Sequence, residues 1–198
     1  MPLIDEDFWE LMKAFLAEEG LVKQHLRSYN EFVKTTLQQI IDEIGGITIE
    51  TPSQKHDIKF GTIEVREPQI VEVDGTVRPI YPREARIRDI TYAAPLYLDV
   101  IFTDEGRESF ERVNIGELPI MVKSDLCLLS RLSKEDYVKF GEDPEEVGGY
   151  FVINGSERVI VALEDLAPNR VLVEVDTRGS RPVYRGKVFS TNVGFRAR

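Results

Sequence analysis

Hydrophobic positions recur at helical spacing over the first quarter of the chain. Phe8, Leu11, Met12 and Phe15 follow one another in steps of three, one and three residues, which predicts a first helix that ends near Gly20. A second stripe with the same spacing predicts a longer helix and consists of Val22, Leu26, Tyr29, Val33, Leu37, Ile40 and Ile44. The simplest interpretation of both stripes is that they face a core, whereas an exposed stripe on the first helix would indicate a surface that docks another subunit.

After this region the hydrophobic period changes to two, which predicts strands. Ile58 and Phe60 share one face, whereas Ile63 and Val65 have the opposite parity, so we expect a bulge or bend at Gly61. Further patterns predict the remaining elements: a hairpin turn at Asp74-Gly75, a short helix from Pro82, a central strand over Leu96–Phe102, a strand over Phe110–Ile115 and a short helix over Ser133–Phe140.

The last quarter of the chain is dominated by short apolar runs. Tyr150–Ile153 and Val159–Leu163 flank Asn154-Gly155, which predicts a hairpin, and further strands are expected over Val171–Val175 and Val183–Phe189. We therefore predict an α+β fold, with an amino-terminal helix pair packed on a mixed, mainly antiparallel sheet. One domain is expected over residues 1–175, and a second, β-rich region over residues 176–198.

Composition excludes several classes of protein. Apolar residues make up 42% of the chain, and no apolar run approaches the roughly 20 residues that span a bilayer, so we expect a cytoplasmic protein without membrane contact. The single cysteine, Cys127, excludes an internal disulfide and reads as a small buried hydrophobe, and with only two histidines a structural metal is not expected. No nucleophile and base can be assembled into a catalytic pair, which argues against an independent hydrolase.

Charge is distributed unevenly. The net charge of −10 argues against a free-standing nucleic-acid-binding domain. Residues 1–149 contain 30 acidic and 17 basic residues, whereas residues 150–198 contain 5 acidic and 8 basic residues. Any contact with nucleic acid is therefore expected late in the chain.

Three stretches carry a specific resemblance. The segment 148–161, GGYFVINGSERVIV, resembles the signature GGYFIINGSEKV of second-largest RNA polymerase subunits. The segment 115–124, IGELPIMVKS, is similar to the family's IGRLPIMLRS, and the segment 84–92, EARIRDITY, is similar to its EARLRNLTY. The stretches occur in the family's order, and weaker similarity extends through Gly20–Thr36. The chain thus resembles the amino-terminal region of the second-largest subunit of DNA-directed RNA polymerase, closer to the archaeal and eukaryotic branch than to the bacterial one.

The resemblance implies a function without catalysis in this region. Such a region corresponds to the protrusion domain and the first strands of the adjacent lobe, which line one side of the DNA cleft. Implied partners are other polymerase subunits, general initiation factors, DNA and the RNA–DNA hybrid. No cofactor is implied here, since the Mg of the assembled enzyme is bound elsewhere. The alternative is a stand-alone mimic of the polymerase domain that binds a transcription factor.

Four residues are candidates for contact with nucleic acid. Arg158 matches a basic family position and could hold two phosphate oxygens, although a surface salt bridge with Glu157 or Glu164 is the plainer alternative. Asn154 precedes the glycine of the predicted turn, which resemblance places near the hybrid, and a structural role suffices for it. Two further candidates are Arg86 and Arg88, for which a solvated face or an intersubunit contact is the alternative.

Overall fold

The computed structural model describes residues 5–51, 55–104, 107–179, 181–192 and 195–196. The chain divides into two compact units, Met1–Val159 and Ile160–Arg198, and each is considered by itself. The boundary between these compact units does not test the expected boundary between family domains at residue 175, which stays a prediction. The predicted region 176–198 also includes residues 180, 193–194 and 197–198, which lie outside the described part.

The predicted long helix is confirmed. It consists of three segments without a break: α2 (Lys23–Glu31), the π-helical turn η1 (Phe32–Thr36) and α3 (Leu37–Ile44). In the π-helical turn the Thr35 hydroxyl donates a hydrogen bond to the Glu31 carbonyl at 2.8 Å. Gly45 ends the helix with φ of +67°, a conformation that glycine adopts without strain. Helix α1 (Asp5–Glu18) precedes it, as predicted.

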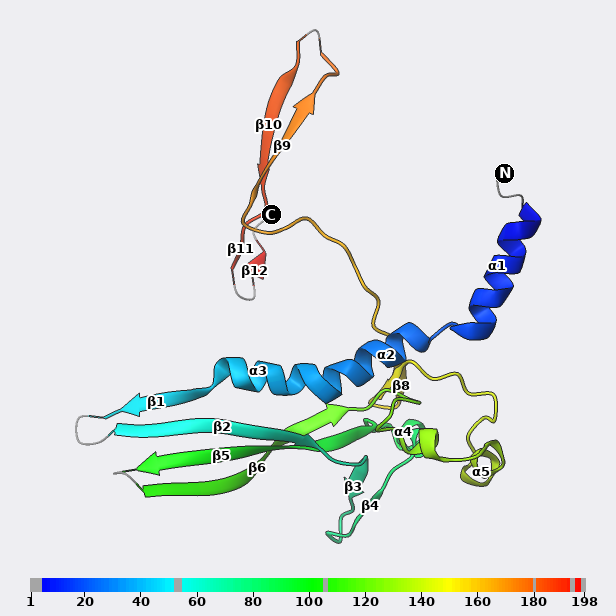
Figure 1. Cartoon of the computed structure of the whole chain (residues 1–198), viewed down its shortest axis with the longest axis vertical. Coiled ribbons are helices and arrows are strands. Elements are labelled where there is room, and N and C mark those ends of the chain that lie inside the picture. Colours follow the sequence, from blue (N-terminus) through cyan, green and yellow to red (C-terminus); the bar gives the residue numbers. More distant parts are fainter. Residues whose placement is uncertain (1–4, 52–54, 105–106, 180, 193–194, 197–198) are drawn as a thin grey trace. The chain divides into compact units, whose positions relative to one another are not determined.

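A four-stranded antiparallel sheet forms the centre of the first unit. Its strands lie in the order β1-β2-β5-β6, and the helix α2–α3 runs along it, with α3 in contact with β2 (Figure 1). Their bounds are β1 Gly46–Glu50, β2 Lys55–Val65, β5 Ala93–Asp104 and β6 Arg107–Pro119. Strand β5 lies inside the sheet, so the prediction of a central strand is confirmed.

The predicted bulge at Gly61 is also confirmed. The pairing of β2 with β5 shifts between Phe60 and Ile63. The side chain of Gln38 on α3 binds the backbone at this bulge. Its Nε2 donates to the Gly61 carbonyl at 3.2 Å, and its Oε1 accepts from the Ile63 backbone amide at 3.0 Å. The backbone groups that the bulge removes from the ladder are thus satisfied by the covering helix.

Small elements extend the sheet at one end. They are the hairpin β3 (Gln69–Val71) and β4 (Val77–Pro79), helix α4 (Pro82–Ile87), the 3-10 turn η2 (Leu128–Arg131), helix α5 (Lys134–Phe140), and the hairpin β7 (Phe151–Ile153) and β8 (Ser156–Arg158). The turn at Asp74-Gly75 and the helix from Pro82 lie where the sequence predicts them. The Ser133 side chain caps α5 by accepting from the Asp136 amide.

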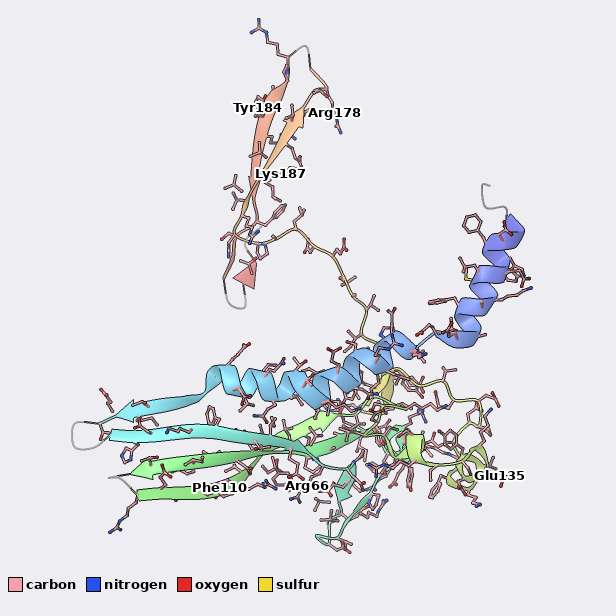
Figure 2. All side chains as sticks on the ribbon, viewed as in Figure 1. Arg66, Phe110, Glu135, Arg178, Tyr184 and Lys187 are labelled. Atoms are coloured by element: carbon pink, nitrogen blue, oxygen red, sulfur yellow. The ribbon has the colours of Figure 1, made fainter. Side chains whose placement is uncertain are left out.

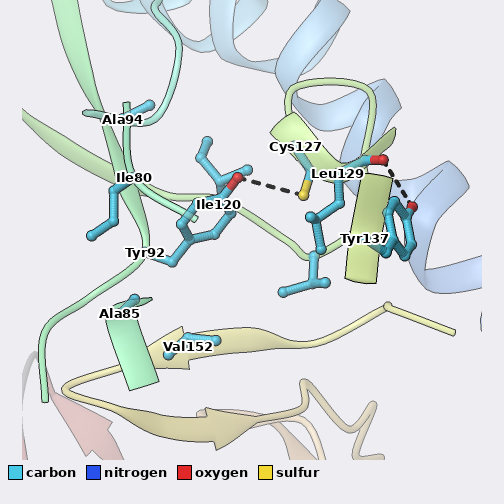
Figure 3. Packing of buried hydrophobic residues seen from close by; sticks show 10 residues of the cluster. Ile80, Ala85, Tyr92, Ala94, Ile120, Cys127, Leu129, Tyr137 and Val152 are labelled. Atoms are coloured by element: carbon cyan, nitrogen blue, oxygen red, sulfur yellow. Dashed lines mark hydrogen bonds between the residues drawn. The ribbon is translucent and has the colours of Figure 1, made fainter. Parts of the chain in front are cut away.

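These small elements enclose the main core (Figure 3). Tyr92 is fully buried, and its hydroxyl donates to the Cys127 sulfur at 3.5 Å and accepts from the Leu128 amide at 3.1 Å. The Tyr137 hydroxyl donates to the Leu129 carbonyl at 2.8 Å. Burial raises the pKa of the Cys127 thiol, so Cys127 is an inert core residue, as expected.

Two expectations need correction. The α+β class and the antiparallel sheet are confirmed, but only the second helix packs on the sheet: every described side chain of α1 from Asp7 to Glu18 is exposed, including Trp9 at 60% and Phe15 at 55%. A hydrophobic stripe in the sequence shows which face of a helix is apolar, but it does not show which surface packs against that face.

The second correction concerns Val159–Leu163, which forms no strand and is exposed. The tight turn pairs Phe151–Ile153 with the three residues directly after Gly155 instead.

The second unit is a β-hairpin with a small extension. It contains β9 (Val171–Asp176) and β10 (Val183–Val188), as predicted, followed by β11 (Thr191–Asn192) and β12 (Phe195–Arg196). Tyr184 and Lys187 lie on β10, and Arg178 follows β9 (Figure 2). Two cross-strand ion pairs, Arg185–Asp176 at 3.0 Å and Lys187–Glu174 at 2.6 Å, lie on one face of the hairpin.

Candidate nucleic-acid interface

The candidate site is built around the turn of the β7–β8 hairpin. Asn154 and Gly155 have φ of +47° and +74°, so both central residues of the turn lie in the left-handed region. Asparagine and glycine are the residues that tolerate this conformation best in a two-residue hairpin loop. The predicted tight turn is confirmed.

The turn is docked on the segment that follows α4. The Gly155 amide donates to the Ile90 carbonyl at 3.0 Å, and the Tyr92 amide donates to the Val152 carbonyl at 2.9 Å. Asn154 exchanges two bonds with Thr91: its amide donates to the Thr91 hydroxyl at 3.1 Å, and that hydroxyl donates to its side-chain oxygen at 3.2 Å. The side-chain oxygen of Asn154 is therefore used within the chain.

Gly155 cannot carry a side chain here. A Cβ atom would lie 2.8 Å from the Cα of Asp89 and 3.1 Å from the Arg86 carbonyl oxygen. Both distances are shorter than ordinary van der Waals contact. The close approach of two backbones explains the glycine as well as the turn does.

The contact between α4 with the segment after it and the β7–β8 hairpin is called the junction below. At the junction, the guanidinium of Arg86 on α4 faces a group of carboxylate and phenol oxygens. Its guanidinium donates to Glu142 at 3.2 Å and to the Tyr150 hydroxyl, and its Nε lies 2.9 Å from Glu157 Oε1 as an ion pair. A fourth oxygen belongs to Glu146, at 3.6 Å. The Glu142 side chain is only 2% exposed and the Arg86 side chain 23% exposed, so the pair is largely removed from water.

The electrostatics of the junction favour the charged arginine. Burial alone would lower the pKa of Arg86, but Tyr150 and Glu142 outweigh it, and the pKa lies above its usual value. Burial raises the pKa of Tyr150, and the hydrogen bond that its hydroxyl donates to Glu146 adds to this effect. The sequence contained no signal that Glu142, Glu146 and Tyr150 meet Arg86, because they lie 56 to 64 residues away from it.

Arg88 belongs to a second, more exposed network. It donates to Glu72 at 2.8 Å and to Glu84 at 2.9 Å, and Arg78 donates to the same two carboxylates. The hydrogen bonds from Arg88 and Arg78 lower the pKa of Glu72 to about 2, and the bond from Arg78 is the largest cause that lowers the pKa of Glu84 to about 2. The four side chains fasten the β3–β4 hairpin to α4.

Arg158 differs from Arg86 on α4 and from Arg88 just after it. It is exposed at the end of β8, opposite Phe151 in the hairpin, and its side chain has no ion pair or hydrogen bond with any residue that the structure describes. The alternative of a salt bridge with Glu157 finds no support in this geometry, since Glu157 pairs with Arg86. The structure thus brings Asn154 and Arg86 together at one junction, ties Arg88 to the neighbouring hairpin, and leaves Arg158 open to solvent.

Neither a metal cluster nor a membrane helix is found within the described ranges. No group of three or more His, Cys, Asp or Glu side chains there is arranged to hold a metal ion. None of the helices in those ranges is long and apolar enough to cross a bilayer.

Comparison with known proteins decides the family. The family described as RNA polymerase beta subunit matches residues 20–176, most of the chain. The chain belongs to this family. The resemblance inferred from the three stretches is therefore confirmed, and it extends over the sheet, the core and the β7–β8 hairpin.

Curated relatives agree. The chain is 48% identical over 193 residues to DNA-directed RNA polymerase subunit Rpo2N of Methanocaldococcus jannaschii, with 95% of this chain and 39% of the relative covered. It is 47% identical over 194 residues to subunit Rpo2 of Saccharolobus shibatae, with 98% of this chain and 17% of the relative covered. Subunit Rpo2N of Halobacterium salinarum is 38% identical over 205 residues. The chain spans about two fifths of the Rpo2N relatives and about a sixth of the Rpo2 relatives.

Proposed function

We propose that this chain acts as a protrusion-like scaffold of a DNA-directed RNA polymerase, lines one side of the DNA cleft and places a few cations against nucleic-acid phosphates. Support comes from family membership and from the names of the relatives, which are polymerase subunits. Other polymerase subunits follow as partners. General initiation factors, duplex DNA and the RNA–DNA hybrid are the further partners that this role requires.

The observation that carries the proposal is the unpaired Arg158. A guanidinium that has no carboxylate partner keeps its donors for an incoming anion, and it can hold two phosphate oxygens at once. Arg86 and Arg88 would have to leave carboxylates first. We therefore rank Arg158 above them as a phosphate contact and give Asn154 the role of shaping the turn that presents it.

The remaining parts of the proposal concern location and cofactors. A polymerase subunit of this kind acts in the cytoplasm, where the template is. We expect no cofactor to be bound by this region, with the catalytic Mg held elsewhere in the assembled enzyme. Residues 176–198 are expected to begin the lobe, and the basic side chains of the second unit would then add to the attraction for DNA.

The test compares Arg158→Ala with Arg131→Ala in the assembled polymerase. Arg131 is an exposed arginine that already pairs with Glu67, so it controls for the loss of a surface charge. Retention of a DNA–RNA scaffold is measured as a function of salt. One lost phosphate contact lowers the slope of log K against log salt by about 0.7–0.9. Equal slopes for the two variants would refute the contact of Arg158 with phosphate.

The same titration separates the kinds of nucleic acid. The titration is carried out once with duplex DNA alone and once with a scaffold that contains the RNA–DNA hybrid. A smaller slope for Arg158→Ala with both would mean that Arg158 contacts duplex DNA, and a smaller slope with the scaffold alone would mean that it contacts the hybrid. Urea unfolding of the Arg158→Ala chain should match the parent, since the side chain contacts no described residue. A loss of stability would mean that the effect on retention is indirect.

A further inference from the structure

Helix α1 carries a broad apolar face. At 100° per residue, six large apolar side chains fall within an arc of about 160°. They are Phe8, Trp9, Leu11, Met12, Phe15 and Leu16. The other positions from Asp7 to Glu18 lie outside this arc and are Asp7, Glu10, Lys13, Ala14, Ala17 and Glu18, of which Glu18 lies about 20° from its edge.

This face is not covered by the part of the chain that the structure describes. The six side chains are between 42% and 64% exposed. A helix of 14 residues is marginal in water without tertiary packing, and six exposed large apolar side chains on one face differ from the single apolar residues that are scattered over ordinary surfaces. The helix therefore needs a partner surface.

Two observations separate α1 from the domain behind it. The family match begins at residue 20, directly after the helix, although relatives align with 98% of the chain. Gly20 itself has φ of +64° with no atom within 4 Å of the position that a Cβ would take. The helix is thus an appendage of the domain and not a layer of its core.

Charge identifies the chemistry of the partner. Lys13 pairs with Glu10 at 2.8 Å, so the cation of the polar side is neutralised within the helix. Over residues 7–18 the helix carries three carboxylates, Asp7, Glu10 and Glu18, against the single cation Lys13, whereas Glu19, just after the helix, is neutralised by Lys23 and Arg27. The polar border of the apolar face is therefore acidic, and a complementary surface is apolar in its centre and basic at its border.

We propose that α1 docks its apolar face into a groove with a basic border on another part of the RNA polymerase, and so anchors this domain in the assembly. The occupant is a polymerase polypeptide because the chain belongs to a polymerase subunit family and spans only a fraction of its relatives. A second copy of the chain fits less well, since two acidic borders would face each other. The proposal rests on family membership and not on the phosphate contact of Arg158.

Site-specific crosslinking tests the docking. A photoreactive residue replaces Phe15 on the apolar face or Ala14 on the polar side, in the second-largest subunit assembled with purified polymerase subunits. We expect position 15 to crosslink to one polymerase segment that contains apolar residues and Lys or Arg, and position 14 to crosslink at least several-fold less. Crosslinks between two copies of the chain, equal crosslinks from both positions, or none from position 15 would overturn the proposal.

Substitutions give a second readout. Phe15→Glu should lower incorporation of the subunit into the polymerase roughly tenfold or more, because a large apolar side chain is replaced by a carboxylate, whereas Ala14→Glu should change it less than about twofold. Glu18→Lys should weaken incorporation, and more at low salt than at high salt. Since the side chains of residues 7–18 are all exposed, both glutamate variants should unfold in urea like the parent. Equal incorporation of the two variants would contradict the docking.

Discussion

Replacing Arg86 by methionine isolates the energetic role of the junction between α4 and the β7–β8 hairpin. Methionine keeps most of the aliphatic volume but removes the charge that faces Glu142, Tyr150 and Glu157. The carboxylate of Glu142, 2% exposed, would then retain the bond from the Arg83 amide at 2.6 Å without a compensating cation.

The expected cost follows from this geometry. Removing one partner of a buried ion pair typically costs 3–5 kcal/mol, because the remaining charge stays desolvated. Arg86 is 23% exposed and Glu142 keeps one donor, so we expect about 2–3 kcal/mol for Arg86→Met. Arg131→Met, which breaks the exposed pair with Glu67, should cost at most about 1 kcal/mol.

Urea unfolding followed by far-ultraviolet circular dichroism measures both values. Tryptophan fluorescence would be a poor probe, since the single tryptophan, Trp9, lies on the exposed helix α1. The double variant Arg86→Met/Glu142→Gln removes both charges and should recover at least half of the loss. If Arg86→Met costs less than about 1 kcal/mol, or if the double variant costs the sum of the single ones, the assignment of a buried pair is refuted.

Two further predictions concern neighbouring contacts. Gly155→Ala should destabilise the first unit by about 2–4 kcal/mol, because a Cβ would meet the Asp89 backbone and φ is positive; an unfolding curve equal to that of the parent would contradict the close approach. The pKa values of Glu72 and Glu84 are lowered to about 2, so their contribution to stability is complete above the unfolded value of 4.5 and is lost as the pH falls toward about 2. Glu84→Gln should therefore flatten the dependence of the unfolding midpoint on pH in this window, and a dependence equal to that of the parent would contradict the ion pairs of Glu84.

Periodicity predicted the secondary structure well because the signals are local. The change of parity at Gly61, the pair Asp74-Gly75 and the pair Asn154-Gly155 each place a bulge or turn at a defined residue. The same signals failed where an element depends on distant partners. Val159–Leu163 has the composition of a strand, but no strand of the described chain pairs with it.

The candidate site was predictable only in part, for the same reason. The motifs named Arg86, Arg88, Asn154 and Arg158, but nothing local shows whether an arginine is free or paired. Arg86 meets acids that lie more than 50 residues away, and Arg88 meets Glu72 across a hairpin. Whether a cation serves the fold or a ligand is decided by tertiary packing.

Under the proposed function, this distinction explains how an acidic chain could contact nucleic acid. Most of its carboxylates lie in the first 149 residues, where Arg86 on α4 holds the β7–β8 hairpin that carries Arg158, and Arg88, just after α4, holds the β3–β4 hairpin. A phosphate would have to compete with Glu142, Glu72 or Glu84 for those arginines, while Arg158 has no such competitor among the described residues. Phosphates would therefore be attracted to a few places and not to the surface at large, and those places are set by which carboxylates the fold brings to each arginine.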